Sequence, residues 1–382
     1  MTDTPDNKNS NDPAVQDSDE LIALRKQIDS CDQQIQRLIQ DRVNVAANIA
    51  KAKLAVDSKA SFYRPEREAQ VLRRVRERNE VLREESNALV SDDEMVRLMR
   101  EIMSISLAAE MPMTVAYLGP EGTYTQAAVV KHFGQAVRNL DVKTIADVFR
   151  VVEQGKAHFG VVPVENSTEG VISSTLDCFA TSNLKVCGEV QLPINHQLLS
   201  NADGLTGVKK IYAHPQALAQ CRKWLARYLP DAEQFSASSN AEAAIIASTE
   251  NDTAAIAGDI AARLYDIQVL ASSIEDETNN TTRFLIIGAN SFASSGLDKT
   301  TIMVSTRNRV GSLFELLKPL YDNGVDMSRI ESRPSKQTNW DYVFFIDLIG
   351  HVDDENVGLA LKELEAQSAF YKLIGSYPVG AL

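Results

Sequence analysis

The sequence predicts a multidomain protein in which an all-helical block, an α/β block and a ferredoxin-like βαββαβ block follow one another along the chain. Apolar residues recur every three or four positions over residues 20–111, which predicts helices. Short apolar strands alternate with helical stretches over 114–288, and a strand–helix–strand–strand–helix–strand pattern fills 299–382. At 382 residues the chain is long enough for several domains, and its 44% hydrophobic content is ordinary for a globular protein.

The composition excludes several classes of function. A net charge of −13 argues against nucleic acid as a partner, and no apolar run is long enough to cross a membrane. Residues 1–19 are polar, and we expect them to be a disordered tail of a cytoplasmic protein and not a signal peptide. Cys31, Cys178, Cys187 and Cys221 lack the spacing of metal ligands, so we expect reduced thiols, no metal and no cofactor.

The helical block begins with a long amphipathic helix, predicted over about residues 20–56. Its apolar stripe is narrow and typical of a helix that packs against another copy or a hairpin partner. Pro65 suits the first turn of a second helix, and Ser91 with Glu94 forms a capping box for a third helix that ends near Met111. The seven-residue repeat consists of Leu21, Leu24, Ile28, Cys31, Ile35, Leu38, Val45, Ile49 and Ala52.

A pair of cations stands out on the long helix. Arg42 interrupts the apolar repeat, and Lys53 lies eleven residues on, close to three turns, so both project from nearly the same face. Nothing acidic is spaced to pair with Arg42, and a buried cation needs a counter-charge, which a dianionic ligand would provide. The alternative is structural: an arginine stem can cover apolar surface, a polar seam residue can set helix register, and Arg67–Glu68 can be a solvated pair.

The segments LIALRKQIDSCDQQIQRLIQDRVNVAANIAKAKL and FYRPEREAQVL resemble the all-helical chorismate mutase family, which forms an intertwined dimer. The reaction is a unimolecular rearrangement, so a site need only select the folded conformer and stabilise charge on the ether oxygen. The resemblance implies Arg42, Lys53 and Arg67 for the carboxylates of chorismate, Arg25 for the arginine that a partner subunit supplies, Glu68 for the substrate hydroxyl, Ser106 for the family's serine, and Glu110 beside the ether oxygen.

Two positions depart from the mutase pattern. Glu110 stands where many members have Gln, and a carboxylate cannot donate a hydrogen bond whereas a carboxylic acid can. We therefore expect mutase activity to fall as the pH rises. Arg64 stands where other members have Asp, which removes that contact.

Polar residues in the α/β block follow the ends of its strands, where ligands bind in open α/β folds. VVPVENSTEG (161–170) ends an apolar strand in four polar side chains, and GPEGTYT (119–125), HPQALAQC (214–221) and NNTTRF (279–284) are further candidates. Each segment alone is explained by a turn or a helix cap. Together they indicate a site for a small polar anion, within a sheet that we expect to be mostly parallel.

These motifs together resemble prephenate dehydratase, which implies two lobes around a cleft, about 114–190 plus 273–288 and about 191–272, as in type-2 periplasmic binding proteins. Aromatisation drives the loss of carbon dioxide and water, so a weak acid and orienting donors suffice. The resemblance implies Thr282 at the departing hydroxyl, Arg283 as the carboxylate partner, Asn166, Ser167 and Gln220 as orienting groups, and Glu165 as a group that tunes the site. Ala213 replaces the serine that precedes HPQ in relatives.

The last block follows a small, polar linker predicted at residues 289–299. VGSLFELL (310–317) and ESRP (331–334) resemble the phenylalanine-binding pair of ACT domains, where the effector binds between paired domains. Glycine permits close backbone approach, and amides at a helix N-terminus can bind a carboxylate. The implied effector residues are Gly311, Ser312, Leu313, Glu331, Ser332, Arg333 and Pro334, with Ser312 and Phe314 replacing smaller or aliphatic residues.

The three resemblances in this order imply a bifunctional chorismate mutase/prephenate dehydratase of phenylalanine synthesis. Such a chain would convert chorismate to prephenate and prephenate to phenylpyruvate, be inhibited by phenylalanine, and form a homodimer or a higher homo-oligomer. Two alternatives stay open. One is a non-catalytic sensor built from a coiled coil, a binding-protein-like module and an amino-acid-sensing domain, and the other is a chain that has kept only one of the two activities.

Overall fold

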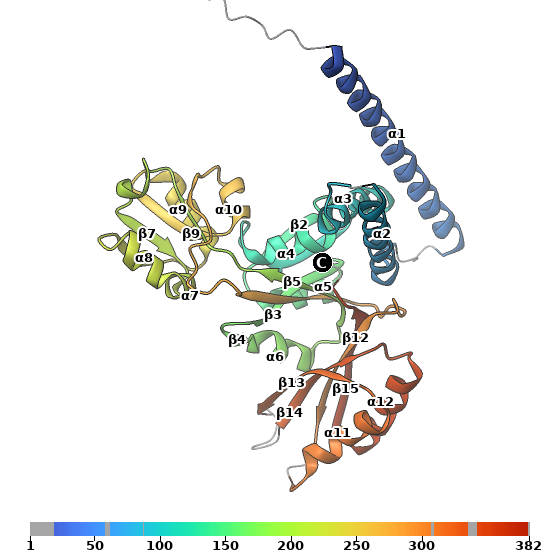
Figure 1. The fold of residues 1–382 in the computed structure, drawn as a ribbon. Coiled ribbons are helices and arrows are strands. Elements are labelled where there is room, and N and C mark those ends of the chain that lie inside the picture. Colours follow the sequence, from blue (N-terminus) through green and yellow to red (C-terminus); the bar gives the residue numbers. More distant parts are fainter. Residues whose placement is uncertain (1–18, 58–61, 87, 307–308, 335–341, 381–382) are drawn as a thin grey trace, which may run out of the picture. The chain divides into compact units, whose positions relative to one another are not determined.

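The computed structural model describes residues 19–57, 62–86, 88–306, 309–334 and 342–380. The predicted disordered tail lies outside the described residues, except that Asp19 begins the first helix. The chain divides into two compact units, Met1–Ser58 and Lys59–Leu382 (Figure 1). Among the described residues, no helix combines the length and the apolar character needed to cross a bilayer.

The described part of the first unit is one long helix, α1, Asp19–Val56. Its bounds confirm the predicted helix. The residues of the apolar repeat keep much of their surface exposed, with Ile28 at 60% and Leu38 at 67%. An exposed apolar stripe on a helix of this length is typical of a surface that packs against another chain.

The second unit begins with two antiparallel helices, α2 (Pro65–Ser86) and α3 (Asp92–Glu110). Ser91 and Glu94 make both hydrogen bonds of the predicted capping box at the start of α3. The short connection between Ser86 and Asp92 turns the chain back, and two ion pairs join the C-terminal half of α2 to the start of α3. These pairs are Arg83–Asp92 and Arg76–Asp93, and the apolar contact consists of Leu72, Val75 and Val96.

A six-stranded sheet with the order β2-β1-β3-β11-β5, and with β4 beside β3, forms the first lobe of the α/β block. Helices α4, α5 and α6 belong to this lobe (Figure 1). The bounds are β1 Thr114–Leu118, α4 Tyr124–Phe133, β2 Arg138–Val142, α5 Ile145–Glu153, β3 Phe159–Asn166, β4 Gly170–Val171, α6 Ser173–Thr181, β5 Lys185–Pro193 and β11 Thr281–Gly288.

A five-stranded sheet with the order β10-β6-β9-β7-β8 forms the second lobe. Two hinge segments, residues 194–196 and 272–280, connect the lobes, which matches the two-lobed fold that was expected. The bounds are β6 Gln197–Ser200, a 3₁₀ turn Leu205–Gly207, β7 Lys210–Ala213, α7 Pro215–Gln220, α8 Arg222–Tyr228, β8 Glu233–Ser236, α9 Asn240–Thr249, β9 Thr253–Ala257, α10 Asp259–Leu264 and β10 Val269–Ala271.

The prediction of mostly parallel pairing is wrong, because both sheets are mixed. β1 is parallel to β2 and β3, and β7 is parallel to β8 and β9. However, β11 is antiparallel to β3 and β5, and β6 is antiparallel to β9 and β10. Parallel neighbours need a crossover within one sheet, whereas β5, β6, β10 and β11 flank the hinge segments that pass between the lobes.

Strand β2 ends at Val142 because the residues that follow it begin helix α5. The side chain of Thr144 caps α5 by accepting a hydrogen bond from the Asp147 amide at 3.1 Å. A threonine that accepts a hydrogen bond from the third residue of a helix favours the helix start over a continued strand.

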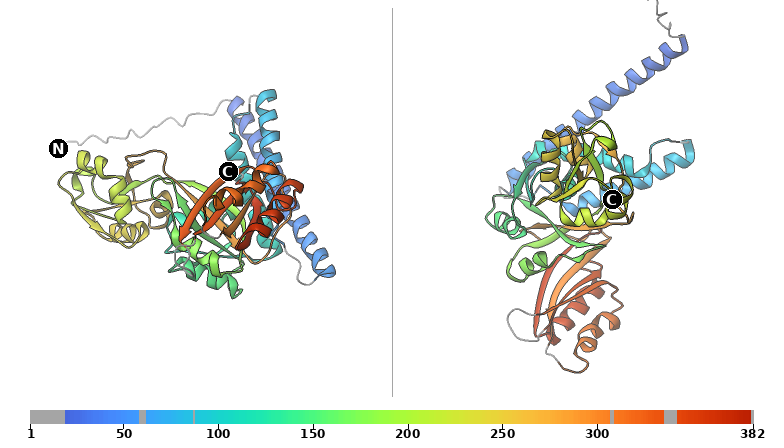
Figure 2. Two further views of the ribbon diagram at one scale, coloured as in Figure 1. Left: turned by 90° about the horizontal axis from the view of Figure 1, so that it is seen from below. Right: turned by 90° about the vertical axis from the view of Figure 1, so that its left-hand side faces the viewer.

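The last block forms a four-stranded antiparallel sheet with the order β13-β14-β12-β15, as expected for a ferredoxin-like βαββαβ unit. Figure 2 shows its two helices on one face of the sheet. Strand β13, which contains ESRP, lies at the edge. The bounds are β12 Asp298–Ser305, α11 Ser312–Asp322, β13 Met327–Pro334, β14 Tyr342–Ile349, α12 Glu355–Gln367 and β15 Phe370–Pro378.

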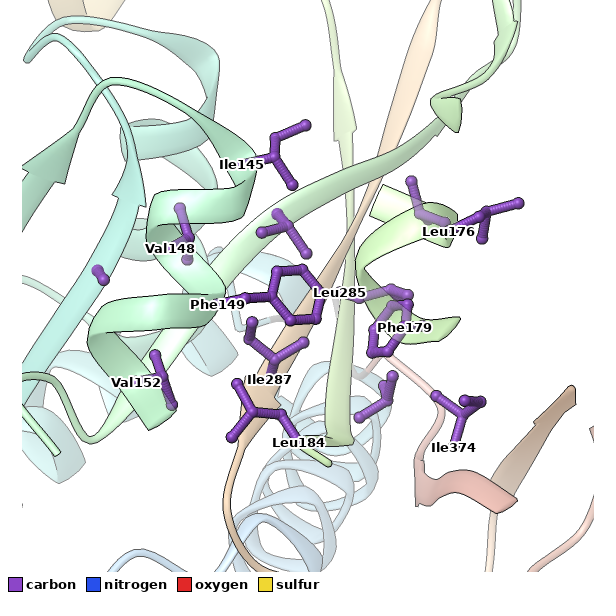
Figure 3. Close-up of a cluster of buried hydrophobic side chains, with 14 of the residues drawn as sticks. Ile145, Val148, Phe149, Val152, Leu176, Phe179, Leu184, Leu285, Ile287 and Ile374 are labelled. Atoms are coloured by element: carbon purple, nitrogen blue, oxygen red, sulfur yellow. The ribbon is translucent and has the colours of Figure 1, made fainter. Parts of the chain in front are cut away.

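The first lobe and the last block share one apolar core (Figure 3). Phe149 and Phe179 meet edge to face, and Ile374 of β15 belongs to the same cluster. Strands β15 and β5 approach so closely that a Cβ atom at Gly375 would lie 2.2 Å from the backbone oxygen of Val186. Only glycine fits at such a contact, so the two sheets are packed together as one body.

The segment predicted to be a small, polar linker, residues 289–299, is held by several hydrogen bonds. The Asp298 carboxylate accepts hydrogen bonds from the Ser294 hydroxyl and from the backbone amides of Ser295 and Gly296, at 2.7, 2.8 and 3.0 Å. Arg73 of α2 also donates to the Ser295 carbonyl. Small polar residues here form a tight turn that is hydrogen-bonded to its surroundings.

Candidate functional site

The polar strand ends of the first lobe meet beside the two hinge segments. Thr282, at the start of β11, lies opposite Asn166, at the end of β3. Two backbone hydrogen bonds join the hinge segments. The Ile194 amide donates to the Asn280 carbonyl at 2.8 Å, and the Ile274 amide donates to the His196 carbonyl at 2.9 Å. The pairing of strands and hinges therefore gathers residues from distant parts of the sequence.

The orientation of the Asn166 side chain is fixed by the backbone. Its Oδ1 accepts from the amides of Thr168 and Glu169, both at 3.0 Å. Its Nδ2 must therefore be the donor to Thr282 Oγ1 and to Asn280 Oδ1, both at 2.8 Å. Because Thr282 Oγ1 accepts from Asn166, the hydroxyl proton of Thr282 can be donated to another acceptor.

The same chain of hydrogen bonds continues to Gln220 on α7. Asn280 Nδ2 donates to Gln220 Oε1 at 3.3 Å, and His196 Nε2 lies 2.7 Å from the same oxygen. Since Oε1 faces these two groups, the amide NH₂ of Gln220 is its remaining polar group. Ser167, the other predicted orienting residue, accepts from the amide of Thr281 at 2.9 Å. Four predicted residues, Asn166, Ser167, Gln220 and Thr282, thus lie in one network.

Sequence reasoning missed three members of this network: Tyr124, His196 and Asn280. The Tyr124 hydroxyl lies 3.1 Å from His196 Nδ1 and 2.7 Å from the Asn195 carbonyl. Tyr124 falls within the GPEGTYT segment and Asn280 within the NNTTRF segment, so both motifs were usable signals. His196 carries no motif and only the hinge brings it to Gln220. Burial lowers the pKa of His196 despite the opposing effects of Gln220 and Glu275, and burial raises the pKa of Tyr124 well above its usual range.

Arg283 does not face this network, and its expected role as the carboxylate partner is not supported. Adjacent residues of a strand point to opposite faces, so Thr282 and Arg283 diverge. The Arg283 guanidinium is only 11% exposed and bonds to Glu189 Oε2 at 2.8 Å, Asp347 Oδ2 at 2.6 Å and the Tyr377 hydroxyl at 2.9 Å. Its charge is already balanced by carboxylates between β11, β5 and the last block.

Two further ion pairs join the edge strand β13 to the first lobe. Glu165 lies 3.0 Å from Nε of Arg329, and Arg333 of ESRP lies 3.2 Å from Asp177 on α6. Arg333 also donates to the Ser173 carbonyl at 2.5 Å. Strand β13 therefore contacts Glu165, the first residue of the ENSTEG segment, and helix α6, which follows that segment.

A polar cleft lies between the two lobes, and Tyr124 is the residue of the network that lines it. It is lined by the GPEGTYT turn, by Lys143, and by His214 and Gln216 of the HPQ motif. Ser238, Ser239 and Asn240 line it from the second lobe. Ala213 is fully buried in β7, and its carbonyl accepts from the Ala237 amide at 2.8 Å.

The residues predicted for the helical block are distributed over three helices. Arg25, Arg42 and Lys53 lie on α1, Arg67 and Glu68 on α2, and Ser106 and Glu110 on α3. Burial raises the pKa of Glu68, whose Oε1 lies 3.7 Å from Nη1 of Arg100. The Ser106 hydroxyl donates to the Ile102 carbonyl at 2.8 Å. Arg64, the departure from the family pattern, pairs with Glu66 at 2.6 Å.

The predicted effector residues lie at the start of helix α11 and at the end of strand β13. Gly311 has φ +82° and is the residue before α11, a left-handed conformation that favours glycine. Ser312 and Leu313 open α11, and Glu331–Pro334 end strand β13. The edge position of β13 leaves one side of the strand unpaired among the described residues.

Fold and site together define an enzyme with a two-lobed α/β domain, a helical domain before it and a ferredoxin-like domain after it. Three family models match in this order: chorismate mutase type II over residues 24–111, prephenate dehydratase over 115–292, and ACT domain over 300–366. The chain belongs to the family of bifunctional chorismate mutase/prephenate dehydratases and carries both enzyme domains.

Similar proteins cover nearly the whole chain. A bifunctional chorismate mutase/prephenate dehydratase of Stutzerimonas stutzeri is 48% identical over 96% of this chain and 100% of its own length. A protein of the same description from Pseudomonas aeruginosa is 47% identical with the same coverage. The crystal structure of an Arthrobacter aurescens prephenate dehydratase in complex with L-Phe is 35% identical, with a TM-score of 0.65, and covers 69% of this chain and 90% of that one.

Proposed function

We propose that this chain converts chorismate to prephenate in its helical domain and prephenate to phenylpyruvate in the cleft of its two-lobed domain, and that phenylalanine inhibits it through the ACT domain. The observation that carries the proposal is the hydrogen-bonded network in which Asn166 donates to Thr282. Membership of the bifunctional family supports the same two activities. We assign residues 20–111, 114–288 and 299–382 to the three domains.

In the dehydratase reaction, the bond from the ring to its carboxylate breaks and carbon dioxide leaves. The electron pair of that bond enters the ring, and the bond to the ring hydroxyl breaks, so that hydroxide departs and takes up a proton to become water. We assign Thr282 to donate a hydrogen bond to the departing oxygen, because Asn166 leaves the threonine proton available. Ser167 and Gln220 would orient the substrate, and Glu165 would tune the site.

In the mutase reaction, we assign Arg42, Lys53 and Arg67 to the two carboxylates of chorismate and Glu68 to its hydroxyl. Arg25 would be supplied by a second subunit, so the active form would be a homodimer or a higher homo-oligomer. The exposed apolar stripe of α1 supports this association. Ser106 and a protonated Glu110 would complete the site, with Glu110 donating to the ether oxygen.

Phenylalanine would bind at the Gly311–Leu313 turn and the Glu331–Pro334 segment of paired ACT domains. The amides at the start of α11 would bind its carboxylate. Strand β13 lies at the edge of its sheet, with no strand partner on its outer side among the described residues, and this supports pairing of two such domains, since an unpaired strand edge can add another strand. The cytoplasmic location stays a prediction.

The test is to supply chorismate to the purified chain and to follow chorismate, prephenate and phenylpyruvate with and without phenylalanine. We expect phenylpyruvate to form and phenylalanine to suppress it. Prephenate that accumulates without phenylpyruvate would reduce the two-lobed domain to a binding module. Chorismate that stays untouched at acidic and neutral pH would remove the mutase and favour a sensor.

A further inference from the structure

His196 occupies a position in the hinge that no motif predicted. It is only 2% exposed, and both of its ring nitrogens lie within hydrogen-bond distance of side chains from different lobes. Nε2 lies 2.7 Å from Gln220 Oε1 of the second lobe, and Nδ1 lies 3.1 Å from the Tyr124 hydroxyl of the first lobe. Its backbone amide donates to Glu275 Oε2 at 2.8 Å, which holds the residue in place.

A chain of hydrogen bonds that begins at backbone amides determines that Nε2 of His196 carries a proton. The amides of Thr168 and Glu169 fix Asn166 Oδ1 as an acceptor, so Asn166 Nδ2 donates to Asn280 Oδ1. Asn280 Nδ2 then donates to Gln220 Oε1, which must also be the acceptor for His196. Nε2 of His196 therefore carries the proton.

The other nitrogen is an acceptor when the ring is neutral. Burial lowers the pKa of His196, which favours the neutral form. With the proton on Nε2, Nδ1 carries a lone pair and lies 3.1 Å from the Tyr124 oxygen, whose single proton is donated to the Asn195 carbonyl at 2.7 Å. Tyr124 also meets the imidazole edge to face, with ring centres 5.9 Å apart, so the ring is held by contacts on both nitrogens and on its face.

An unrestrained glutamine side chain can turn its amide over and exchange its oxygen with its nitrogen at little cost. In this hydrogen-bonded network the exchange would bring two donors, His196 Nε2 and Asn280 Nδ2, against the NH₂ group of Gln220. The donor from His196 is the shorter contact and comes from a buried ring. His196 thus keeps the NH₂ group of Gln220 as the polar group that remains for a ligand oxygen.

We propose that His196 is a positioning residue of the dehydratase, which fixes the amide of Gln220 so that it presents a hydrogen-bond donor to an oxygen of the substrate. This inference rests on the proposed dehydratase function of the cleft. His196 acts through Gln220 and does not itself touch the substrate. The proposal adds a residue outside the recognised motifs to the group that orients prephenate.

The test compares His196→Gln with His196→Asn in the full-length chain, with prephenate as the substrate. A glutamine can place an amide N–H near the position of His196 Nε2, whereas the shorter asparagine cannot reach Gln220. Both replacements are polar, so they are matched for burial. We expect His196→Asn to lower kcat/KM by about 10- to 100-fold, the usual effect of losing one buried hydrogen bond, and His196→Gln to stay within about threefold of the wild type.

A double-mutant cycle shows whether His196 acts through Gln220. We expect the pair His196→Asn and Gln220→Ala to be no worse than Gln220→Ala alone, because the second change removes the group that the first one misplaces. Additive losses would overturn the proposal, as would His196→Asn with unchanged kcat/KM. Equal losses in both His196 variants, together with a lower thermal midpoint, would show a structural role and overturn it too.

Mutase activity in the same samples serves as the control for intact protein. If the wild-type chain forms no phenylpyruvate from prephenate, the proposed function of the cleft fails whatever His196 does. If the wild type is active and the matched variants do not differ, only the role of His196 fails. The two failures are therefore distinguishable.

Discussion

The two proposed active sites differ in how the chain assembles them. In the two-lobed domain, Asn166, Gln220 and Thr282 come from distant segments and meet in one hydrogen-bonded network whose polarity begins at backbone amides. In the helical domain, Arg25, Arg42 and Lys53 lie on α1, whereas Arg67 and Glu68 lie on α2. The residues of the proposed dehydratase site are thus brought together by the fold of one unit. The predicted mutase residues are spaced along helices, and we expect a second chain to be needed to assemble them into a site.

The largest expected effect concerns stability on the dehydratase side. Arg283→Met would leave Glu189 and Asp347 buried with less compensation, and we expect unfolding to become easier by about 3–5 kcal/mol. Urea unfolding followed by tryptophan fluorescence measures this. The matched control is Arg150→Met, whose exposed ion pair with Asp147 should contribute about 1 kcal/mol or less. Equal stability of the two variants would show that the buried cluster does not hold β11 against the ACT domain.

The next effect separates the two sites by activity. Lys53→Met should lower mutase activity by about 10²–10³-fold, the usual loss when one charge-stabilising group is removed, and should leave the dehydratase reaction with added prephenate unchanged. Lys51→Met, on the same helix and exposed, is the matched control. If both lysine variants behaved alike, the assignment of Lys53 to the substrate would be wrong.

The mutase site should also respond to pH in a way that the dehydratase site does not. Glu110 can donate to the ether oxygen only as a carboxylic acid, so each pH unit above its pKa should lower mutase activity about tenfold. Glu110→Gln donates at every pH, and we expect its mutase profile to be flat where the wild type declines. A mutase pH profile that does not change in Glu110→Gln would contradict this role.

The smallest expected effect is on inhibition by phenylalanine, and it tests how the ACT domain is coupled to the dehydratase site. Arg329 joins strand β13 to Glu165, so Arg329→Met should weaken inhibition by phenylalanine a few-fold while changing the uninhibited rate less. The magnitude follows from the loss of one partly buried ion pair. Lys318→Met, in an exposed pair with Asp322 on α11, is the control. Unchanged inhibition in Arg329→Met would contradict this role of Arg329, and the Arg333–Asp177 ion pair would then be the next contact to test.

The sequence predicted the elements well where local chemistry determines them. The capping box at Ser91, Pro65 at the start of α2 and the six elements of the ACT domain are all present. Antiparallel β11 could not be predicted from its own residues, because its direction depends on two passages between the lobes. His196 was missed for the same reason, since a hinge brings it to Gln220.

Arg283 teaches a different lesson. The alternation of side chains along a strand was available from the sequence, and it places Arg283 opposite to Thr282. The two-residue alternation of a strand predicts the side-chain direction of Arg283 better than its position next to Thr282 in the motif does. The carboxylates that bind Arg283 come from β5 and β14, and this pairing depends on the packing of the ACT domain against the first lobe.

The central claim is that Asn166 leaves the proton of Thr282 available for the departing hydroxyl. The most direct measurement is a time course from chorismate with Thr282→Val, which keeps the shape of the side chain and removes the hydroxyl, beside Thr282→Ser, which keeps the donor. We predict that Thr282→Val accumulates prephenate at the wild-type rate while phenylpyruvate formation falls by about 100-fold or more, and that Thr282→Ser forms phenylpyruvate readily. Phenylpyruvate formed by Thr282→Val at close to the wild-type rate would contradict the account.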